Sequence, residues 1–188
     1  MIDHGYGAML GPVDRAHKER MRQWRNDPRI YAWCRQDGLI SDQDQDRWFE
    51  RQSVDPSIRM FMVLAILPSK DVEPCGVAGL TSIDWLNRRA EFSLYVAPGM
   101  HRKGLGEKAL LTLLSYGFRD LGLHVIWGET FESNPAIKLF KKIGFTQEGT
   151  RRGFYWKHGR HIDAHLISMT EDEWRQRYSS QPLRSPGR

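Results

Sequence analysis

The sequence predicts a mixed α/β (α+β) fold built on a largely antiparallel sheet. In the first half of the chain, three apolar, strand-like runs follow one another with short turns between them, as in an antiparallel meander. In the second half, helical patterns alternate with strand patterns. The chain of 188 residues is the size of one ordinary domain. We therefore expect a single domain over residues 1–178, followed by a disordered basic tail over residues 179–188.

The first half should contain two helices and then three strands. Asn26-Asp27-Pro28 is placed to break the first helix, and Ser41 is a good N-cap for the second, with Asp44 three residues further on. The third strand alternates, so its residues should face opposite sides of the sheet: Glu91, Ser93 and Tyr95 on one side, Phe92, Leu94 and Val96 on the other. The expected helices span residues 14–25 and 41–52, and the expected strands span residues 59–67, 76–84 and 90–96.

The second half begins with a long helix. From Leu105 to Leu121 apolar residues recur at steps of three and four, and Gly122 is placed to end the helix. A later helix should open at Asn134-Pro135, with the proline in its first turn, and end at Gly144. Strands are expected over residues 125–130, 145–148 and 162–169, the last two joined by a hairpin across 157–159, and a closing helix over 171–178.

Composition excludes several classes of protein. The longest apolar run, residues 60–67, is far shorter than the roughly 20 residues of a membrane span, so we expect no membrane partner. The first residues lack the pattern of a signal peptide, so we expect a cytoplasmic protein. Cys34 and Cys75 form no C-x-x-C pair, and no histidine pair has a third ligand nearby, so we expect neither a disulfide framework nor a metal.

The charge balance favours anionic partners. The chain has 28 basic and 23 acidic residues, a net charge of +5, and the basic residues gather in short clusters such as 101–103 and 151–152. Such a surface suits either a nucleic acid or a small polyphosphate ligand. Because the clusters lack the interleaved aromatic residues of a single-strand binding platform, we expect no nucleic-acid partner.

The most informative segment is 96–107, where a strand ends, a basic glycine loop follows and the long helix starts. The first amides of a helix lack intrahelical partners, and the helix dipole adds partial positive charge. Gly104 and Gly106 remove side chains that would block an approaching ligand, and Arg102 and Lys103 add full charges. The segment therefore predicts an anion site suited to a pyrophosphate.

Other glycine-loop motifs fit the segment less well. Residues 104–109 match the loose dinucleotide pattern G-x-G-x-x-A, but a Rossmann loop follows its strand directly, whereas here seven residues separate Val96 from Gly104. No Gly-Lys-Ser/Thr is present, so a P-loop is excluded.

The sequence resembles the GNAT superfamily of N-acetyltransferases over about residues 6–170. The family signature (Gln/Arg)-x-x-Gly-x-(Gly/Ala) reads His101-x-x-Gly104-x-Gly106, and the family's Asn-containing segment and helix running into Gly-Phe are matched by residues 132–145. The resemblance implies a twisted sheet of about seven strands, splayed between strands four and five. It implies acetyl-CoA as co-substrate and a small or peptidic amine as acceptor.

The resemblance also implies a set of acetyl-CoA-binding residues. Backbone groups near Tyr95 and Val96 would hold the pantetheine arm, and Asn134 would contact it. The loop amides would hold the pyrophosphate, and a lysine of the following helix would lie near a phosphate. The remaining residues implied in these roles are His101, Arg102, Lys103, Gly104, Leu105, Gly106, Glu107, Lys138 and Lys141.

Catalysis needs a proton acceptor, because an ammonium has no lone pair with which to attack a thioester. We favour Glu129 as the base, with Glu91 as its competitor. The family often protonates the leaving thiolate from a tyrosine, but that place here holds Phe140. Either Tyr95, Ser133 or Tyr155 substitutes, or solvent protonates the thiolate.

The acceptor stays open at this point. The resemblance narrows to two subgroups, one acting on ribosomal-protein N-termini and the other on a nucleotide-linked amino sugar, and the segment 24–28 favours the second. The residues implied near the acceptor are Trp24, Arg25, Arg35 and Trp48. Because Phe140 replaces the tyrosine, a CoA-binding sensor without turnover is the alternative. A homodimer through the C-terminal strands is also expected.

Overall fold

Seven strands form one sheet in the computed structural model, which describes residues 1–67, 69, 71–157 and 159–178. The strand order is β1-β2-β3-β4-β5-β7-β6, and every described neighbour pair is antiparallel except β4 with β5, which is parallel. The predicted mixed α/β fold is therefore confirmed. The expected tail, 179–188, lies outside the described residues.

The elements follow one another in a simple order. In chain order they are β1 (Ala8–Pro12), η1 (Arg15–His17), α1 (Lys18–Asn26), α2 (Pro28–Tyr31), α3 (Asp42–Val54), β2 (Arg59–Ile66), β3 (Val72–Asp84), β4 (Arg89–Val96), α4 (Leu105–Ser115), η2 (Tyr116–Asp120), β5 (Val125–Phe131), α5 (Ile137–Ile143), β6 (Thr146–Lys157), β7 (Arg160–Thr170) and α6 (Glu171–Tyr178).

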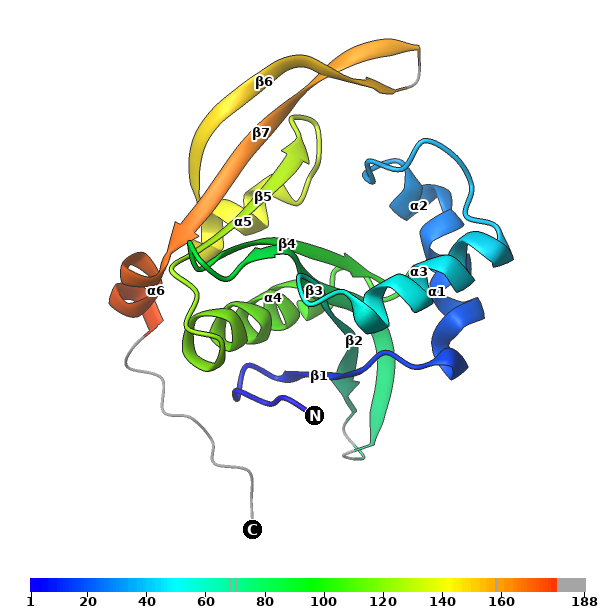
Figure 1. Ribbon diagram of the computed structural model, residues 1–188, viewed down its shortest axis with the longest axis horizontal. Coiled ribbons are helices and arrows are strands. Elements are labelled where there is room, and N and C mark those ends of the chain that lie inside the picture. Colours follow the sequence, from blue (N-terminus) through cyan, green and yellow to red (C-terminus); the bar gives the residue numbers. More distant parts are fainter. Residues whose placement is uncertain (68, 70, 158, 179–188) are drawn as a thin grey trace.

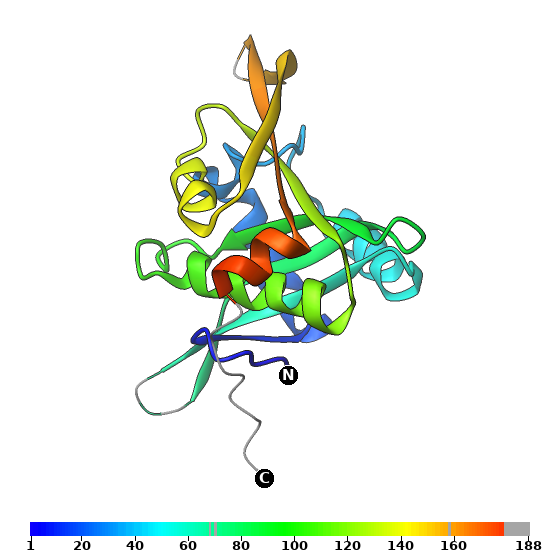
Figure 2. The same cartoon turned by 90° about the vertical axis from the view of Figure 1, so that its left-hand side faces the viewer.

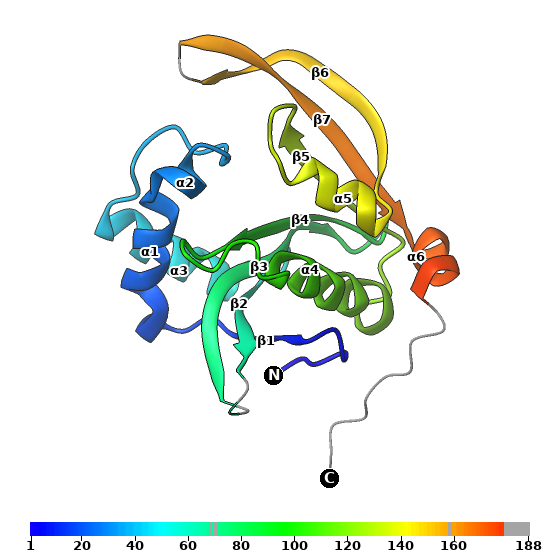
Figure 3. The same cartoon turned by 180° about the vertical axis from the view of Figure 1, so that it is seen from behind.

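Helices cover the two faces of the sheet (Figures 1 and 3). The larger core lies on the side of α4, whose leucines 110, 113 and 114 are fully buried against the sheet. A smaller core lies on the side of α1 and α3, where Met21 and Phe49 pack over β2 and β3. On β4, Leu94 and Val96 join the first core and Tyr95 the second, which confirms the predicted alternation.

The C-terminal hairpin β6–β7 extends well beyond the rest of the sheet (Figure 2). It is longer than predicted, since β6 continues past Glu148 to Lys157 and β7 already begins at Arg160. Irregular register between Arg151 and Tyr155 bends β6, and this interruption hides the strand's period-two pattern. Part of the expected turn, residue 158, lies outside the described residues.

Several other predicted elements differ at their ends. The strand β1 was not predicted, because it has five residues that include Gly11 and Pro12, but it pairs antiparallel with β2. The predicted first helix is a 3-10 turn followed by α1, and α2 starts a new helix after Asp27, which caps it. The helix expected from Asn134 begins at Ile137, because the Asn134 side chain accepts a hydrogen bond from the Ala136 amide and closes a turn first.

The strands β4 and β5 pair over three positions and then separate. The paired residues are Arg89 with Val125, Ala90 with Ile126, and Glu91 with Trp127. At the point of separation the Phe92 ring lies against Gly128, where any Cβ would come within 2.4 Å of the ring. Phe92 also packs against Phe140, at 5.3 Å between ring centroids. The predicted splay between strands four and five is thus present, with an aromatic ring at its base.

Candidate active site

The glycine loop leads into α4 as a chain of turns in the left-handed region. Arg102 has φ 63° and Gly104, the N-cap of α4, has φ 72°. The first helical hydrogen bond runs from the Lys108 amide to the Gly104 carbonyl, which leaves the amides of residues 105–107 without intrahelical acceptors. A Cβ built at Gly104 meets no atom within 4 Å. The helix start therefore faces open space, as a phosphate-binding turn requires.

A cavity of about 480 Å³ lies in front of this loop, and we call it the loop cavity. It is lined from β4, the glycine loop and the residues before α5, and Trp33 and Cys34 close it from the other side. It brings together six residues that the sequence analysis assigned to acetyl-CoA: Tyr95, Val96, His101, Arg102, Gly106 and Asn134.

The other predicted acetyl-CoA contacts lie around the loop cavity rather than in its wall. Lys103, Gly104, Leu105 and Glu107 belong to the loop and the first turn of α4. Glu107 pairs with Lys142 at 2.6 Å. Lys138 and Lys141 are exposed on α5 and do not line the loop cavity.

One predicted backbone contact is already engaged. The Val96 carbonyl, assigned to the pantetheine arm, accepts a hydrogen bond from Nε2 of His101 at 2.9 Å. A ligand that uses this carbonyl must therefore turn the His101 ring aside. His101 is exposed, so the ring has room to move.

A second cavity, of about 330 Å³, continues the first beyond the separation of β4 and β5, and we call it the carboxylate cavity. The two cavities share five lining residues: Trp33, Cys34, Leu94, Asn134 and Phe140. Both candidate bases, Glu91 on β4 and Glu129 on β5, line the carboxylate cavity.

The two carboxylates are linked by one guanidinium group. Nη2 of Arg35 donates to Oε1 of Glu91 at 2.5 Å, and Nη1 of Arg35 lies 3.7 Å from Oε2 of Glu129. Burial opposes the charge on Arg35, but the Glu91 carboxylate and the Tyr155 phenol raise the pKa of the guanidinium overall. Arg35, predicted near the acceptor, therefore stands beside both candidate bases.

Glu129 has two further partners from the C-terminal hairpin. Nη1 of Arg151 lies 3.1 Å from Oε2, and the Tyr155 hydroxyl donates to the same oxygen at 3.2 Å. Burial raises the pKa of the Tyr155 phenol, so it stays protonated at neutral pH. The sequence placed Arg151 only in a charge cluster, because its contact with Glu129 depends on the bend and length of β6.

The three candidate proton donors, Tyr95, Ser133 and Tyr155, occupy different positions, and Tyr155 bonds to Glu129 without lining either cavity. Tyr95 lines the loop cavity, and burial raises the pKa of its phenol. Ser133 is exposed on the turn before α5 and lines neither cavity. Phe140 is buried with its ring edge-on to Phe92, so this position belongs to an aromatic cluster.

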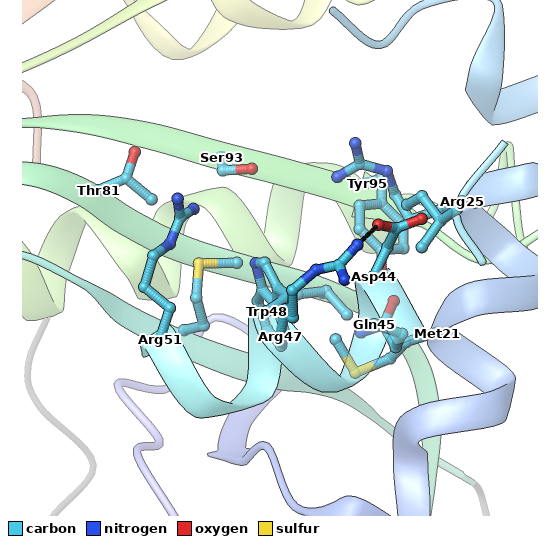
Figure 4. Close-up of a pocket in the computed structure, with 13 residues that line it drawn as sticks. Met21, Arg25, Asp44, Gln45, Arg47, Trp48, Arg51, Thr81, Ser93 and Tyr95 are labelled. Carbon is cyan, nitrogen blue, oxygen red and sulfur yellow. Dashed lines mark hydrogen bonds and ion pairs between the residues drawn. The ribbon is translucent and has the colours of Figure 1, made fainter. Parts of the chain in front are cut away.

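A third cavity, of about 510 Å³, lies between α1, α3 and the sheet, and we call it the arginine cavity (Figure 4). Three guanidinium groups, from Arg25, Arg47 and Arg51, line it against one carboxylate, Asp44, which is bonded to Arg47. In Figure 4, the guanidinium groups of Arg25 and Arg51 point to the same side as the hydroxyl group of Thr81.

The predicted acceptor residues divide between the cavities. Arg25 and Trp48 line the arginine cavity, whereas Trp24 packs beneath it against Tyr95. Arg25 and Ser93 also line the carboxylate cavity, which makes the two cavities neighbours. Arg25 is held by Gln36, which accepts from its Nε at 2.9 Å.

Within the part of the chain that the structure describes, no three His, Cys, Asp or Glu side chains gather as metal ligands would. None of the described helices combines the length and the apolar character needed to cross a membrane.

A split parallel strand pair, a helix start open to an anion and buried carboxylates beyond it are the features that the resemblance to coenzyme A-dependent acyltransferases implies. The match to a family model for the acetyltransferase (GNAT) domain over residues 8–146 carries this further. The chain belongs to the GNAT family, and it is an acetyl-CoA-dependent N-acetyltransferase.

Individual relatives agree with this assignment. The chain is 25% identical over 170 residues to the spermidine N(1)-acetyltransferase of Escherichia coli K12, covering 90% of this chain and 89% of that protein. It is 30% identical over 101 residues to a putative ribosomal N-acetyltransferase of Bacillus subtilis, covering 53% and 55%. A crystal structure of the Vibrio cholerae spermidine N-acetyltransferase with CoA and spermine shares the fold, with a TM-score of 0.82 and 23% identity over 89% of this chain and 98% of that one.

Proposed function

We propose that this enzyme acetylates a primary amine on an acceptor that also carries an anionic group, and that the acceptor is a nucleotide-linked amino sugar. The observation behind this proposal is the arginine cavity beside the carboxylate cavity. Three guanidinium groups face one carboxylate there, and that carboxylate is already bonded to Arg47. Guanidinium groups pair well with phosphates, and they repel polycations.

The two cavities suit the two ends of such an acceptor. The arginine cavity, of about 510 Å³, has the size of a small-ligand pocket and offers the Trp48 indole beside its charges. The amine would then lie in the carboxylate cavity, reached past Arg25 and Ser93, which line both. The polyamines named for the relatives would meet positive charge in this position.

The open space at Gly104 and the outward amides of α4 support acetyl-CoA binding in the loop cavity. Bound there, the co-substrate supplies an activated acetyl group as a thioester. The transfer is a direct attack in a ternary complex: the amine nitrogen forms a bond to the carbonyl carbon, and the carbon–sulfur bond breaks.

The protons are assigned to two side chains in this proposal. Glu129, buried at the end of β5, takes the proton that the amine loses, and Tyr155 holds that carboxylate in position. Of the three candidate donors, Tyr95 lines the loop cavity and also the arginine cavity, and we assign to it the proton for the departing thiolate. Glu91 is the alternative base from the same cavity.

The test is thiol release from acetyl-CoA with matched acceptors. An amino sugar linked to a nucleoside diphosphate is compared with the same sugar without the nucleotide, with spermidine and with a peptide that has a free N-terminus. We expect the nucleotide-linked sugar to have the highest kcat/KM. Replacing Arg51 with Gln should raise its KM and leave the KM of the free sugar unchanged. A preference for spermidine, or the same KM for both sugars, would contradict the assignment.

We also propose that the enzyme works in the cytoplasm as a homodimer. Support for the dimer comes from β6, an edge strand of the sheet, whose Phe154 and Trp156 are 56% and 64% exposed. Light scattering after gel filtration tests it, and a single monomeric species at all concentrations would contradict it.

A further inference from the structure

The Arg35 guanidinium lies between the two candidate bases and is the most exposed member of that group. The Arg35 side chain is 45% exposed, whereas the side chains of Glu91 and Glu129 are 10% and 3% exposed. The carboxylates are therefore fixed in the wall of the cavity, and the guanidinium covers them from the solvent side.

The partners of Arg35 belong to regular structure, but Arg35 does not. Glu91 and Glu129 stand on β4 and β5, and Arg151 stands on β6. Arg35 belongs to the connection between α2 and α3. Hydrogen bonds fix that connection on both sides of Arg35, so the Arg35 side chain can move outward without unfolding the segment. These hydrogen bonds join Arg25 and Lys157 to Gln36, Cys34 to Tyr31, and Asn26 to Ile40.

The charge balance of the carboxylate cavity limits what can enter it. Three guanidinium groups, from Arg25, Arg35 and Arg151, already outnumber the two carboxylates there, so the charges sum to +1. A primary amine has a pKa between about 8 and 10, so it arrives mostly as an ammonium at neutral pH. Adding it would bring a further uncompensated positive charge, which is costly, whereas exchanging it for Arg35 leaves the sum unchanged.

The exchange leaves Glu129 in place. Arg151 and Tyr155 hold its carboxylate from the C-terminal hairpin, so Glu129 keeps its position when Arg35 moves away.

We propose that Arg35 is a built-in competitor of the acceptor: its guanidinium occupies the place of the substrate ammonium between Glu91 and Glu129, and the acceptor must displace it. The proposal rests on the proposed function, since it assumes that the acceptor amine reacts in the carboxylate cavity. It makes Arg35 a residue that sets acceptor affinity rather than one that binds the acceptor's anionic group.

Steady-state kinetics of Arg35→Gln test this proposal, with the acceptor that has the highest kcat/KM as the substrate. If the Arg35 guanidinium occupies the ammonium position in about nine of ten enzyme molecules, removing it lowers the KM for the amine by about tenfold. The KM for acetyl-CoA should not change. Arg35→Lys keeps a competing cation and should retain most of the wild-type KM. Arg22→Gln is the matched control, because Arg22 pairs with Glu19 on the outer side of α1.

A small guanidinium compound gives a second readout. Methylguanidinium should inhibit Arg35→Gln competitively against the amine, and it should inhibit the wild type much less, because its place is already filled. An increase in the KM for the amine in both Arg35 variants, or no inhibition of Arg35→Gln by methylguanidinium, would overturn the proposal. If the wild type acetylates no amine at all, the proposed function fails instead.

Discussion

Gly104 and Gly122 have similar positive φ angles at opposite ends of one helical run. Gly104 precedes α4 with φ 72°, and Gly122 follows η2 with φ 63°; a Cβ built at either meets no atom within 4 Å. A side chain at either position would meet no neighbouring atom. A non-glycine residue at either position would, however, be strained by the positive φ angle. The difference between them is the ligand expected at Gly104.

Substitution of Gly104 and Gly122 gives a matched pair of variants. Gly104→Leu and Gly122→Leu should each lower the free energy of unfolding by about 1–2 kcal/mol, because a non-glycine residue is strained in this conformation. Only Gly104→Leu should abolish acetyl-CoA binding in calorimetry. Equal acetyl-CoA affinity of the two variants would show that the diphosphate is not held at the start of α4.

The second prediction separates the two carboxylates. Glu129→Gln should lower kcat by about 10²–10⁴-fold, the usual contribution of a general base. Glu91→Gln should lower kcat less. The reverse pattern would make Glu91 the base. Circular dichroism of both variants shows whether the fold is kept.

The third prediction concerns the proton donor. Tyr95→Phe should lower kcat while leaving the affinity for acetyl-CoA near that of the wild type, because the ring still packs against Trp24. Burial raises the pKa of the Tyr95 phenol, so the wild-type rate should show no alkaline loss from this group below its ordinary value of 10.0. An unchanged kcat in Tyr95→Phe would leave protonation to solvent.

The fourth prediction is about stability. Thr170 and Glu173 form a reciprocal cap at the start of α6: the Thr170 amide donates to Glu173 at 2.7 Å, and the Glu173 amide donates to the Thr170 hydroxyl at 3.2 Å. The amide hydrogen bond from Thr170 lowers the pKa of Glu173 below its ordinary value of 4.5. A carboxyl whose pKa is lower in the folded state stabilises the fold above its unfolded pKa, and this contribution is lost as the pH falls through the folded pKa.

Glu173→Ala should therefore cost about 1 kcal/mol at pH 7, the typical value of a helix cap, and less below pH 4. Asp172→Ala is the control, since it removes the same charge from the same helical turn without breaking the cap. Urea unfolding at both pH values measures the difference. Equal costs for the two variants at pH 7 would contradict the assigned role of Glu173.

The sequence predicted elements whose ends are marked by local chemistry. Ser41 caps α3 and exchanges hydrogen bonds with Asp44, as the spacing indicated. The alternation in β4 and the start of α4 at Leu105 were also predictable, because each depends on neighbouring residues. The same is true of the glycine loop, which leads into the start of α4 as the sequence indicated.

What depends on distant contacts was not predictable. The link from Arg35 to Glu91 joins residues 56 positions apart, and the contact of Arg151 with Glu129 requires a bend in β6 that no local pattern encodes. The arginine cavity likewise needs α1 and α3 to lie on the same face of the sheet. Sequence reasoning named most of the side chains and missed which of them meet.

If acetyl-CoA binds across the short junction between β4 and β5, as proposed, its binding should stabilise the folded enzyme. Only three residue pairs join these described strands, so local unfolding should begin at this junction. A ligand that binds across the junction binds the native state and not the unfolded one. It raises the free energy of unfolding by about 2.7 kcal/mol when its concentration is 100 times its Kd. Proteolysis should therefore remove this protein faster in cells depleted of acetyl-CoA than in cells with a normal acetyl-CoA concentration.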